Sequence, residues 1–234
     1  MYGRIIGGEE HSFGVSGKLI MNALVMYDHQ TRTLWSQFLG RGVKGPLSGT
    51  KLDVLPVTQT TWSLWRDLHP DTLVLDKGGR YGGDPYSSYY EDGRAGVIGE
   101  TNRDERLGRK DLVLGIADAG STKAYPFAAL EDQPVVNDSV GDTDILVFFD
   151  PDTGTALAFD RTVDGSPLSF RLEGQVNGVQ TVLVDDRTGS TWVAFTGKAV
   201  GGKMKGTTLK RVPSHLSFWF AWTDWNPETE LYAG

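Results

Sequence analysis

The stretch LVMYDHQTRTLWSQFLGRGVKGPLSGTKLDVLPVTQTTWSLWRDLHPDT, residues 24–72, has a close counterpart at residues 181–229, TVLVDDRTGSTWVAFTGKAVGGKMKGTTLKRVPSHLSFWFAWTDWNPET. The two segments align without a gap at a spacing of 157 residues, which places Trp35 on Trp192, Gly49 on Gly206 and Pro70 on Pro227. A repeat of this kind predicts an internal duplication. We therefore expect the chain to contain two related halves.

The repeat divides the chain into a first copy at residues 1–75, a linker at residues 76–111, and a second copy at residues 112–234 that pairs with the first into one compact unit. By the same spacing, the first copy would begin about 44 residues before Met1, so we expect it to be incomplete at its N-terminal end. The linker is rich in glycine, tyrosine and charge and is long for a passive connection, which indicates an ordered loop or a binding element.

Short runs rich in Val, Thr, Phe and Trp are separated by many of the 30 glycines, as in strands joined by tight turns. Hairpins are predicted at residues 24–37 and 144–161, and a further strand, TKLDVLP, at residues 50–56. Tryptophans about three residues apart predict short helices at residues 61–69 and 217–226. The expected fold is mainly β, with antiparallel sheets built from two duplicated halves that each carry a short Trp-rich helix.

Composition argues against several classes of protein. A net charge of −7 and a pI near 5.1 are unsuited to binding nucleic acid. There are no cysteines, so disulfides and thiolate metal sites are excluded. No apolar run approaches the roughly 18 residues of a membrane span, and the N-terminal MYGRIIGGEEHSF lacks a signal-peptide core.

The first strand has an unpaired edge in this interpretation. The repeat aligns Arg4 with Arg161, which follows the second strand of the hairpin predicted at residues 144–161. The first copy has no such hairpin mate upstream, which would leave backbone donors and acceptors unpaired at a sheet edge. We therefore expect another protein chain, or a rearranged segment, to cover this edge.

Two aromatic sets are the candidate ligand-binding residues. The first is the tryptophans of the two predicted helices, and the second is the tyrosines of the linker. In sequence order they are Trp62, Trp65, Tyr81, Tyr86, Tyr89, Tyr90, Trp219 and Trp222. Large aromatic side chains dominate core burial, so burial of the tryptophans against the sheets is favoured over an aromatic ligand platform.

No catalytic residue, metal site or cofactor is predicted. No two of the four histidines have a spacing suited to a shared metal ion, and the repeat does not conserve any of them between its copies. Asp150, Asp152 and Gly154 resemble the start of a calcium loop, but the remaining ligands and the closing glutamate are missing. A tight turn is the better interpretation of Asp150, Asp152, Thr153 and Gly154.

Several phrases in a fixed order resemble one prokaryotic family, catalogued as domain of unknown function 3179. They are FGVSGKL, LVMYD, LWSQ, LDVLP, TTWSLWRDLHPDTLVL, RYGGDPYSSYY, VLGI, KAYPF, VVND and ALAFDR, and they span nearly the whole chain. The resemblance implies a duplicated, glycine-rich protein, and it implies an extracytoplasmic or periplasmic location because many members look exported or lipid-anchored. It implies no established activity.

The chain departs from that family at one motif. Members typically carry Cys-Pro-Leu-Cys-Gly between two hairpin strands, a plausible metal or redox site, and the aligned residues here are Asp150-Pro-Asp-Thr-Gly154. The turn-forming proline and glycine remain, and both thiols are absent, so thiol chemistry is excluded at this place. The resemblance therefore implies a divergent member.

Three functions follow as hypotheses. The first and favoured one is a non-catalytic interaction or structural module, an accessory subunit of a larger extracytoplasmic or membrane-associated assembly. The second is a binding module for a small molecule or carbohydrate that uses a cleft between the two copies together with the tyrosines of the linker. The third is a metal-dependent enzyme built from Asp150, Asp152 and His69, which only their convergence in space would support.

Overall fold

The computed structural model describes residues 1–76, 78, 83 and 86–234, and these divide into two compact units. The first unit comprises Met1–Val57, Arg94–Lys110 and Phe218–Pro227. The second comprises Thr58–Gly93, Asp111–Ser217 and Glu228–Gly234. The helix at Trp62–Leu68 thus belongs to the second unit, and the helix at Trp219–Trp225 belongs to the first.

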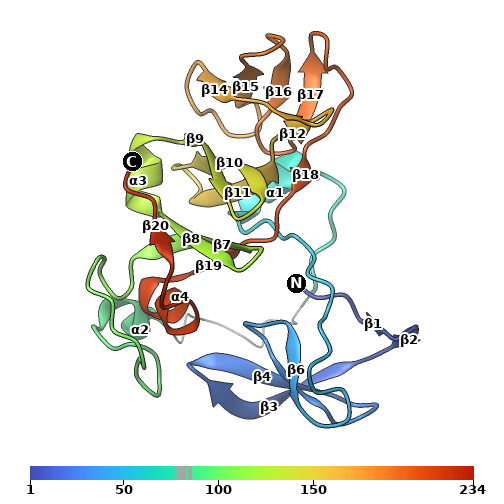
Figure 1. The fold of residues 1–234 in the computed structure, drawn as a ribbon, viewed down its shortest axis with the longest axis vertical. Coiled ribbons are helices and arrows are strands. Elements are labelled where there is room, and N and C mark those ends of the chain that lie inside the picture. Colours follow the sequence, from blue (N-terminus) through green and yellow to red (C-terminus); the bar gives the residue numbers. More distant parts are fainter. Residues whose placement is uncertain (77, 79–82, 84–85) are drawn as a thin grey trace. The chain divides into compact units, whose positions relative to one another are not determined.

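The first unit is built on one antiparallel sheet of four strands in chain order (Figure 1). A small β1–β2 hairpin precedes this sheet, and one helix joins it from the end of the chain. The elements are β1 Ile5–Ile6, β2 Glu9–Glu10, β3 Phe13–Ile20, β4 Ala23–Asp28, β5 Leu34–Ser36, β6 Arg41–Lys44 and α4 Trp219–Trp225. The strand predicted at residues 50–56 does not form; Lys51 and Val54 make only isolated bridges, to Arg41 and Tyr2.

The second unit contains three four-stranded sheets with the orders β19-β7-β8-β20, β18-β11-β10-β9 and β14-β15-β16-β17. Its helices are α1 Trp62–Leu68, α2 Ser87–Glu91 and α3 Phe127–Asp132. Its first strands are β7 Leu112–Asp118, β8 Ser121–Pro126, β9 Val135–Val140, β10 Thr143–Asp150, β11 Thr155–Asp160, β12 Thr162–Val163 and β13 Ser166–Pro167. The remaining strands are β14 Phe170–Glu173, β15 Val182–Asp185, β16 Thr191–Val193, β17 Lys198–Gly201, β18 Lys210–Arg211, β19 His215–Phe218 and β20 Glu230–Leu231.

Strand β10 connects the two hydrophobic clusters of the second unit. Its side chains alternate between the two faces of the sheet, as they do in any strand. Leu146 and Phe148 join a cluster with Trp192 and with Leu64 of α1. Ile145, Val147 and Phe149 join the other cluster, which β7, β8 and α3 complete. This burial on both faces explains why the sequence of β10 is a nearly continuous apolar run.

Sheets β3–β6 and β14–β17 have the same construction. Residues 157 positions apart are called equivalent from here on, and Phe13 pairs with Asp28 as the equivalent Phe170 pairs with Asp185. A shift of register follows the first residue of β5, and another lies at the equivalent place in β16. The mainly β, antiparallel fold with short helices is thus confirmed. None of the described helices is long and apolar enough to cross a membrane.

Candidate functional site

Buried aspartates organise the tight turns of three hairpins. In the β4–β5 turn, the carboxylate of Asp28 accepts hydrogen bonds from the Thr31 N–H at 2.5 Å, the Thr33 N–H at 3.1 Å and the Trp35 indole N–H at 2.9 Å. The equivalent Asp185 binds the equivalent three donors at 2.7, 3.2 and 3.0 Å. Each aspartate therefore joins a turn to a core tryptophan, which is a structural role.

These hydrogen bonds control the ionisation of Asp28. Burial alone would raise the pKa of Asp28, because it removes water from the charged form. The hydrogen bonds from Trp35 and Thr31 oppose this effect and, with a smaller contribution from His11, lower the pKa to about 2. The pKa of Asp185 is likewise lowered, because the bonds from Trp192, Thr188 and Ser190 outweigh its burial.

Acid is expected to destabilise the protein through Asp28. A carboxyl group whose pKa is lower in the folded state stabilises the fold above its unfolded pKa, and this stabilisation is lost as the pH falls through the folded pKa. For Asp28 the window runs from the ordinary aspartate pKa of 3.8 down to about 2. We expect the free energy of unfolding to fall by about 2 kcal/mol across this pH window. Urea titrations at several pH values would measure it.

The control for this prediction is a pair of variants. Asp28→Asn should flatten the dependence of unfolding free energy on pH between about pH 4 and pH 2 relative to the wild type. Asp53→Asn, the same change on an exposed residue of the same unit, is the control for the substitution itself. An Asp28→Asn protein with the wild-type pH dependence would contradict the assignment.

The third turn joins β10 to β11 and comprises residues 151–154. Asp150 is fully buried at the end of β10, and it accepts hydrogen bonds from the Thr153 hydroxyl at 2.7 Å and the Asp152 N–H at 3.2 Å. Thr153 Oγ1 lies 2.7 Å from Thr155 Oγ1, and Thr155 donates in turn to Thr60. The predicted turn is confirmed. Its polar groups bond to one another, and no nucleophile and base are paired there.

The residues of the enzyme hypothesis do not form a metal site. Among the residues that the structure describes, no three histidine, aspartate or glutamate side chains converge. His69 ends helix α1, where its ring packs on Trp65 with centroids 4.2 Å apart. The two rings line a shallow pocket of about 480 Å³ with Leu68 and residues 70–72.

The four candidate tryptophans have different environments. Trp219 and Trp222 of α4 are fully buried, as predicted. The prediction is wrong for Trp62 of α1, whose side chain is 51% exposed, and Trp65 is half-buried. The two helices have similar sequences, so the difference must come from what packs against each of them.

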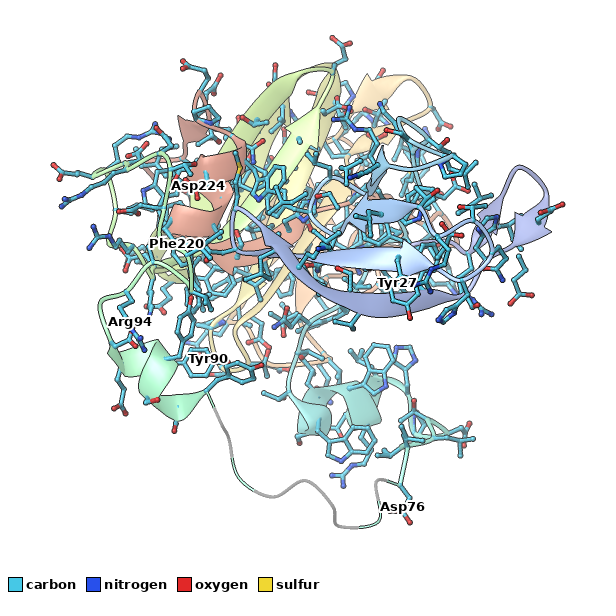
Figure 2. The ribbon with its side chains drawn as sticks, turned by 90° about the horizontal axis from the view of Figure 1, so that it is seen from below. Tyr27, Asp76, Tyr90, Arg94, Phe220 and Asp224 are labelled. Atoms are coloured by element: carbon cyan, nitrogen blue, oxygen red, sulfur yellow. The ribbon has the colours of Figure 1, made fainter. Side chains whose placement is uncertain are left out.

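The described candidate tyrosines, Tyr86, Tyr89 and Tyr90, lie at helix α2. Tyr86 and Tyr90 are exposed, and the rings of Tyr89 and Tyr90 meet edge to face with centroids 6.3 Å apart; Figure 2 labels Tyr90. Tyr81 lies outside the described residues. Tyr89 and Tyr90 belong to this short surface helix and Tyr86 precedes it, and none of the three lines the pocket beside His69.

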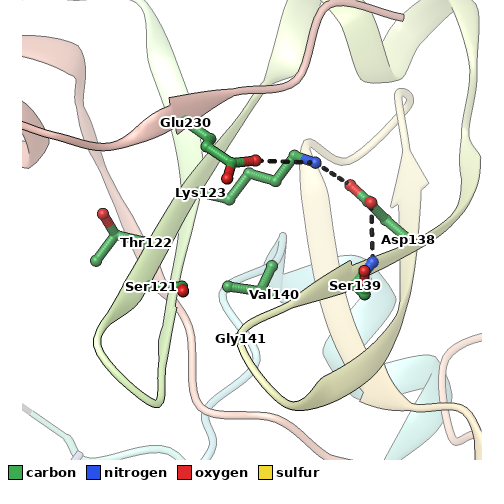
Figure 3. A pocket seen from close by; sticks show the side chains of 8 residues that line it. All are labelled: Ser121, Thr122, Lys123, Asp138, Ser139, Val140, Gly141 and Glu230. Atoms are coloured by element: carbon green, nitrogen blue, oxygen red, sulfur yellow. Dashed lines mark hydrogen bonds and ion pairs between the residues drawn. The ribbon is translucent and has the colours of Figure 1, made fainter.

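A polar pocket of about 290 Å³ lies beside strand β8 (Figure 3). Lys123 Nζ is 2.7 Å from the carboxylate of Asp138 and 3.6 Å from that of Glu230. The Tyr125 hydroxyl donates to the same Asp138 carboxylate at 2.9 Å. The other lining residues are Ser121, Thr122, Ser139, Val140 and Gly141.

Ionisation in this pocket follows from its ion pair. Burial alone would raise the pKa of Asp138, but hydrogen bonds from Lys123, the Ser139 N–H and Tyr125 lower it. Burial, and then the neighbouring Asp138 carboxylate, raise the pKa of Tyr125. The charged groups are therefore already matched to one another, and a bound molecule would have to compete with these bonds.

The N-terminal strand segment has one paired edge and one open edge. Tyr2 lies opposite Val54, and the bonds beside this pair run from the Gly3 N–H to Asp53 and from the Leu55 N–H to Met1, both at 2.9 Å. In an antiparallel ladder this pattern directs the N–H and C=O of Tyr2 to the opposite side. No described residue bonds to the N–H or C=O of Tyr2, whereas the C=O of Arg4, on the same side, accepts from the N–H of His11 at 2.8 Å.

The equivalent segment in the second unit has both edges filled. Phe159, the equivalent of Tyr2, lies between Arg211 of β18 and Leu146 of β10. The N–H of Arg161 donates to the carbonyl of Asp144 at 3.0 Å. The pairing of Phe159 with Arg211 corresponds to the pairing of Tyr2 with Val54, so this side is the same in both units. The two units differ on the other side, where β10 pairs with Phe159.

The side chains of the two segments also differ in whether they have partners on this side. The Arg161 guanidinium is 13% exposed and bonds to the Asp144 carboxylate and the Asp138 carbonyl. Asn137 of β9 bonds to both the N–H and the C=O of Phe170, at 2.8 and 2.7 Å. The equivalent Arg4 is 61% exposed and pairs only with Glu10 among the described residues. Sequence reasoning aligned Arg4 with Arg161, but it missed Asn137 and Asp144, whose partners are distant in the sequence.

Comparisons with known proteins give a family and no activity. The model of a family described as "Protein of unknown function (DUF3179)" matches residues 1–230. No curated protein and no solved structure matches the chain.

Proposed function

Because the chain belongs to this family of proteins of unknown function, no activity is inherited, and we propose from the open strand edge that it is a non-catalytic interaction module. The observation that carries the proposal is the difference between the Tyr2–Arg4 segment and its equivalent at Phe159–Arg161. The same bonds are present on one side of both segments, and on the other side only the second segment has a strand. An open edge is a template for pairing with another chain.

The second unit indicates what the partner must offer. It must supply an antiparallel strand that bonds to the N–H and C=O of Tyr2 and to the N–H of Arg4, as Asp144 bonds to the N–H of Arg161. That strand carries a carboxylate for Arg4, as Asp144 serves Arg161. A neighbouring strand carries an asparagine for the backbone of Phe13, as Asn137 serves Phe170. With such a partner, the chain would be an accessory subunit of a larger assembly. We propose that this assembly is extracytoplasmic.

The small-molecule hypothesis has less support. The polar pocket of Figure 3 is about 290 Å³, near the lower limit of ligand pockets, and such sites are usually lined by apolar side chains. Its lysine and aspartate already pair with each other at 2.7 Å. The arrangement favours an ion pair that fixes β8 to β9.

The hairpin of residues 134–150, displayed on a soluble carrier protein, is the probe for the open edge. It contains β9 and β10 with Asn137 and Asp144, so it presents the chemistry that the edge is proposed to recognise. We expect saturable binding to the intact chain. Asn137→Ala or Asp144→Ala in the hairpin should weaken binding by about tenfold, because each removes hydrogen bonds to the protein. Surface-immobilised hairpin would measure the affinities.

Variants of the chain complete the test. Arg4→Ala should weaken binding of the hairpin by a similar factor of about ten, whereas Lys18→Ala, on an exposed lysine of β3, should not. Absence of binding, or equal affinity for the wild type and Arg4→Ala, would overturn the proposal.

A further inference from the structure

Helix α4 is covered by a segment that precedes β7. The Asp224 carboxylate accepts hydrogen bonds from the Thr101 N–H at 2.7 Å, the Thr101 hydroxyl at 3.0 Å and the Asn102 N–H at 2.6 Å. The indole N–H of Trp219 donates to the carbonyl of Asp104 at 3.2 Å, and the guanidinium of Arg106 lies over the Trp219 ring at 5.2 Å. Figure 2 labels Asp224 and Phe220 on this helix. The covered face of α4 is therefore bound by a Thr-Asn-x-Asp-x-Arg segment.

Helix α1 keeps the residues that make those contacts, but its face is uncovered. Trp62 is the equivalent of Trp219, and Asp67 is the equivalent of Asp224. Trp62 is 51% exposed and Asp67 is exposed, whereas Trp219 and Asp224 are buried. No described residue forms a hydrogen bond with the Trp62 indole or the Asp67 carboxylate.

We propose that the Trp62–Asp67 face of α1 binds a segment of a partner protein, distinct from a second copy of this chain, that carries the pattern Thr-Asn-x-Asp-x-Arg. Its threonine and asparagine N–H groups bind the Asp67 carboxylate, its aspartate carbonyl accepts from the Trp62 indole, and its arginine lies on the Trp62 ring. Carboxylate bonds to backbone N–H groups and a guanidinium over an indole are both favourable contacts.

Charge supports this occupant. Residues 62–76 carry three carboxylates and one guanidinium, a net charge of −2. Residues 94–110, which contain the segment that covers α4, carry five cationic and three anionic side chains, a net charge of +2. A segment of that composition therefore complements the α1 face electrostatically.

The apolar residues that follow α1 are also exposed. Leu73, Val74 and Leu75 are 96%, 66% and 80% exposed. Their equivalents, residues 230–232, form β20 and its extension, which pair with β8. Both the helix and the segment that follows it therefore lack, in the first copy, the cover that their equivalents have.

The probe is a fluorescent peptide with the sequence of residues 94–110, titrated with the whole protein and followed by anisotropy. We expect saturable binding that weakens by about tenfold or more in Asp67→Asn, because the carboxylate accepts several hydrogen bonds. Asp71→Asn, a change of the same charge on an exposed neighbour that makes none of the proposed hydrogen bonds, should weaken binding much less than Asp67→Asn does. Arg106→Ala in the peptide should also weaken binding, and this change cannot affect the folding of the protein.

Three outcomes would overturn the inference. The first is a peptide that fails to bind, or that binds Asp67→Asn as tightly as the wild type. The second is binding that is lost in Asp224→Asn and kept in Asp67→Asn, because the peptide would then be exchanging with the segment on α4. The third is a dimer in sedimentation that Asp67→Asn abolishes, because the occupant would then be a second copy of the chain.

This inference rests on the proposed interaction function but uses a different surface. Arg4→Ala should leave binding of the peptide intact, and Asp67→Asn should leave binding of the displayed hairpin intact. Failure of either probe therefore identifies which of the two proposals is wrong.

Discussion

Replacing Asp185 by alanine is expected to lower the free energy of unfolding by about 3 kcal/mol. The fully buried carboxylate accepts hydrogen bonds from the indole of Trp192, the Thr188 hydroxyl and the N–H groups of Thr188 and Ser190. Alanine would leave these donors without their acceptor, and a buried unpaired donor costs about 1 to 3 kcal/mol. Urea denaturation followed by tryptophan fluorescence would measure the loss.

The neighbouring aspartate provides the control. The side chain of Asp186 is 58% exposed, and its one interaction with a described residue is a surface ion pair with Arg171 at 3.4 Å. Asp186→Ala should change stability by less than about 0.5 kcal/mol. Equal losses in the two variants would show that charge alone, and not the hydrogen-bonded turn, stabilises this part of the sheet.

The hairpins could be predicted from the sequence because their determinants are local. A polar turn that begins with aspartate separates two apolar runs at residues 24–37 and 144–161, and both become hairpins. The local pattern predicts that Asp28 and Asp185 bond two residues onward in the turn. They bond three and five residues onward, and the indole seven residues onward completes the site.

The covering of surfaces could not be predicted in this way. Trp62 and Trp219 occupy equivalent places in similar helices, and residues 101–106 cover Trp219 on α4, whereas Trp62 is 51% exposed. The same holds for Arg4 and Arg161, because the carboxylate that binds Arg161 belongs to another strand. Local sequence determines which side chains a helix or strand presents, whereas segments remote in the sequence determine whether those side chains are covered.

The close approach of strand β17 to the Asp185 turn leads to a second large effect. Gly202 has a φ of +77°, and a Cβ added there would lie 2.7 Å from the Cα of Ser190 and 2.6 Å from its hydroxyl oxygen. Ser190 is held by Asp185, and its hydroxyl accepts a hydrogen bond from the N–H of Met204 at 3.0 Å. Gly202→Ala is therefore expected to cost about 3 kcal/mol, because it combines a left-handed backbone with displacement of a bonded neighbour.

Gly206→Ala separates the two contributions. Gly206 has a φ of +94°, and an added Cβ would meet nothing within 4 Å, so only the backbone cost of about 1 kcal/mol should appear. Chemical denaturation of both variants would give the difference of about 2 kcal/mol that we assign to the contact with Ser190. Equal losses of stability in the two variants would mean that the sheet can shift at this contact without losing stability. A larger loss at Gly202 would show that packing against the Asp185 turn, beyond the backbone conformation alone, requires glycine at this position.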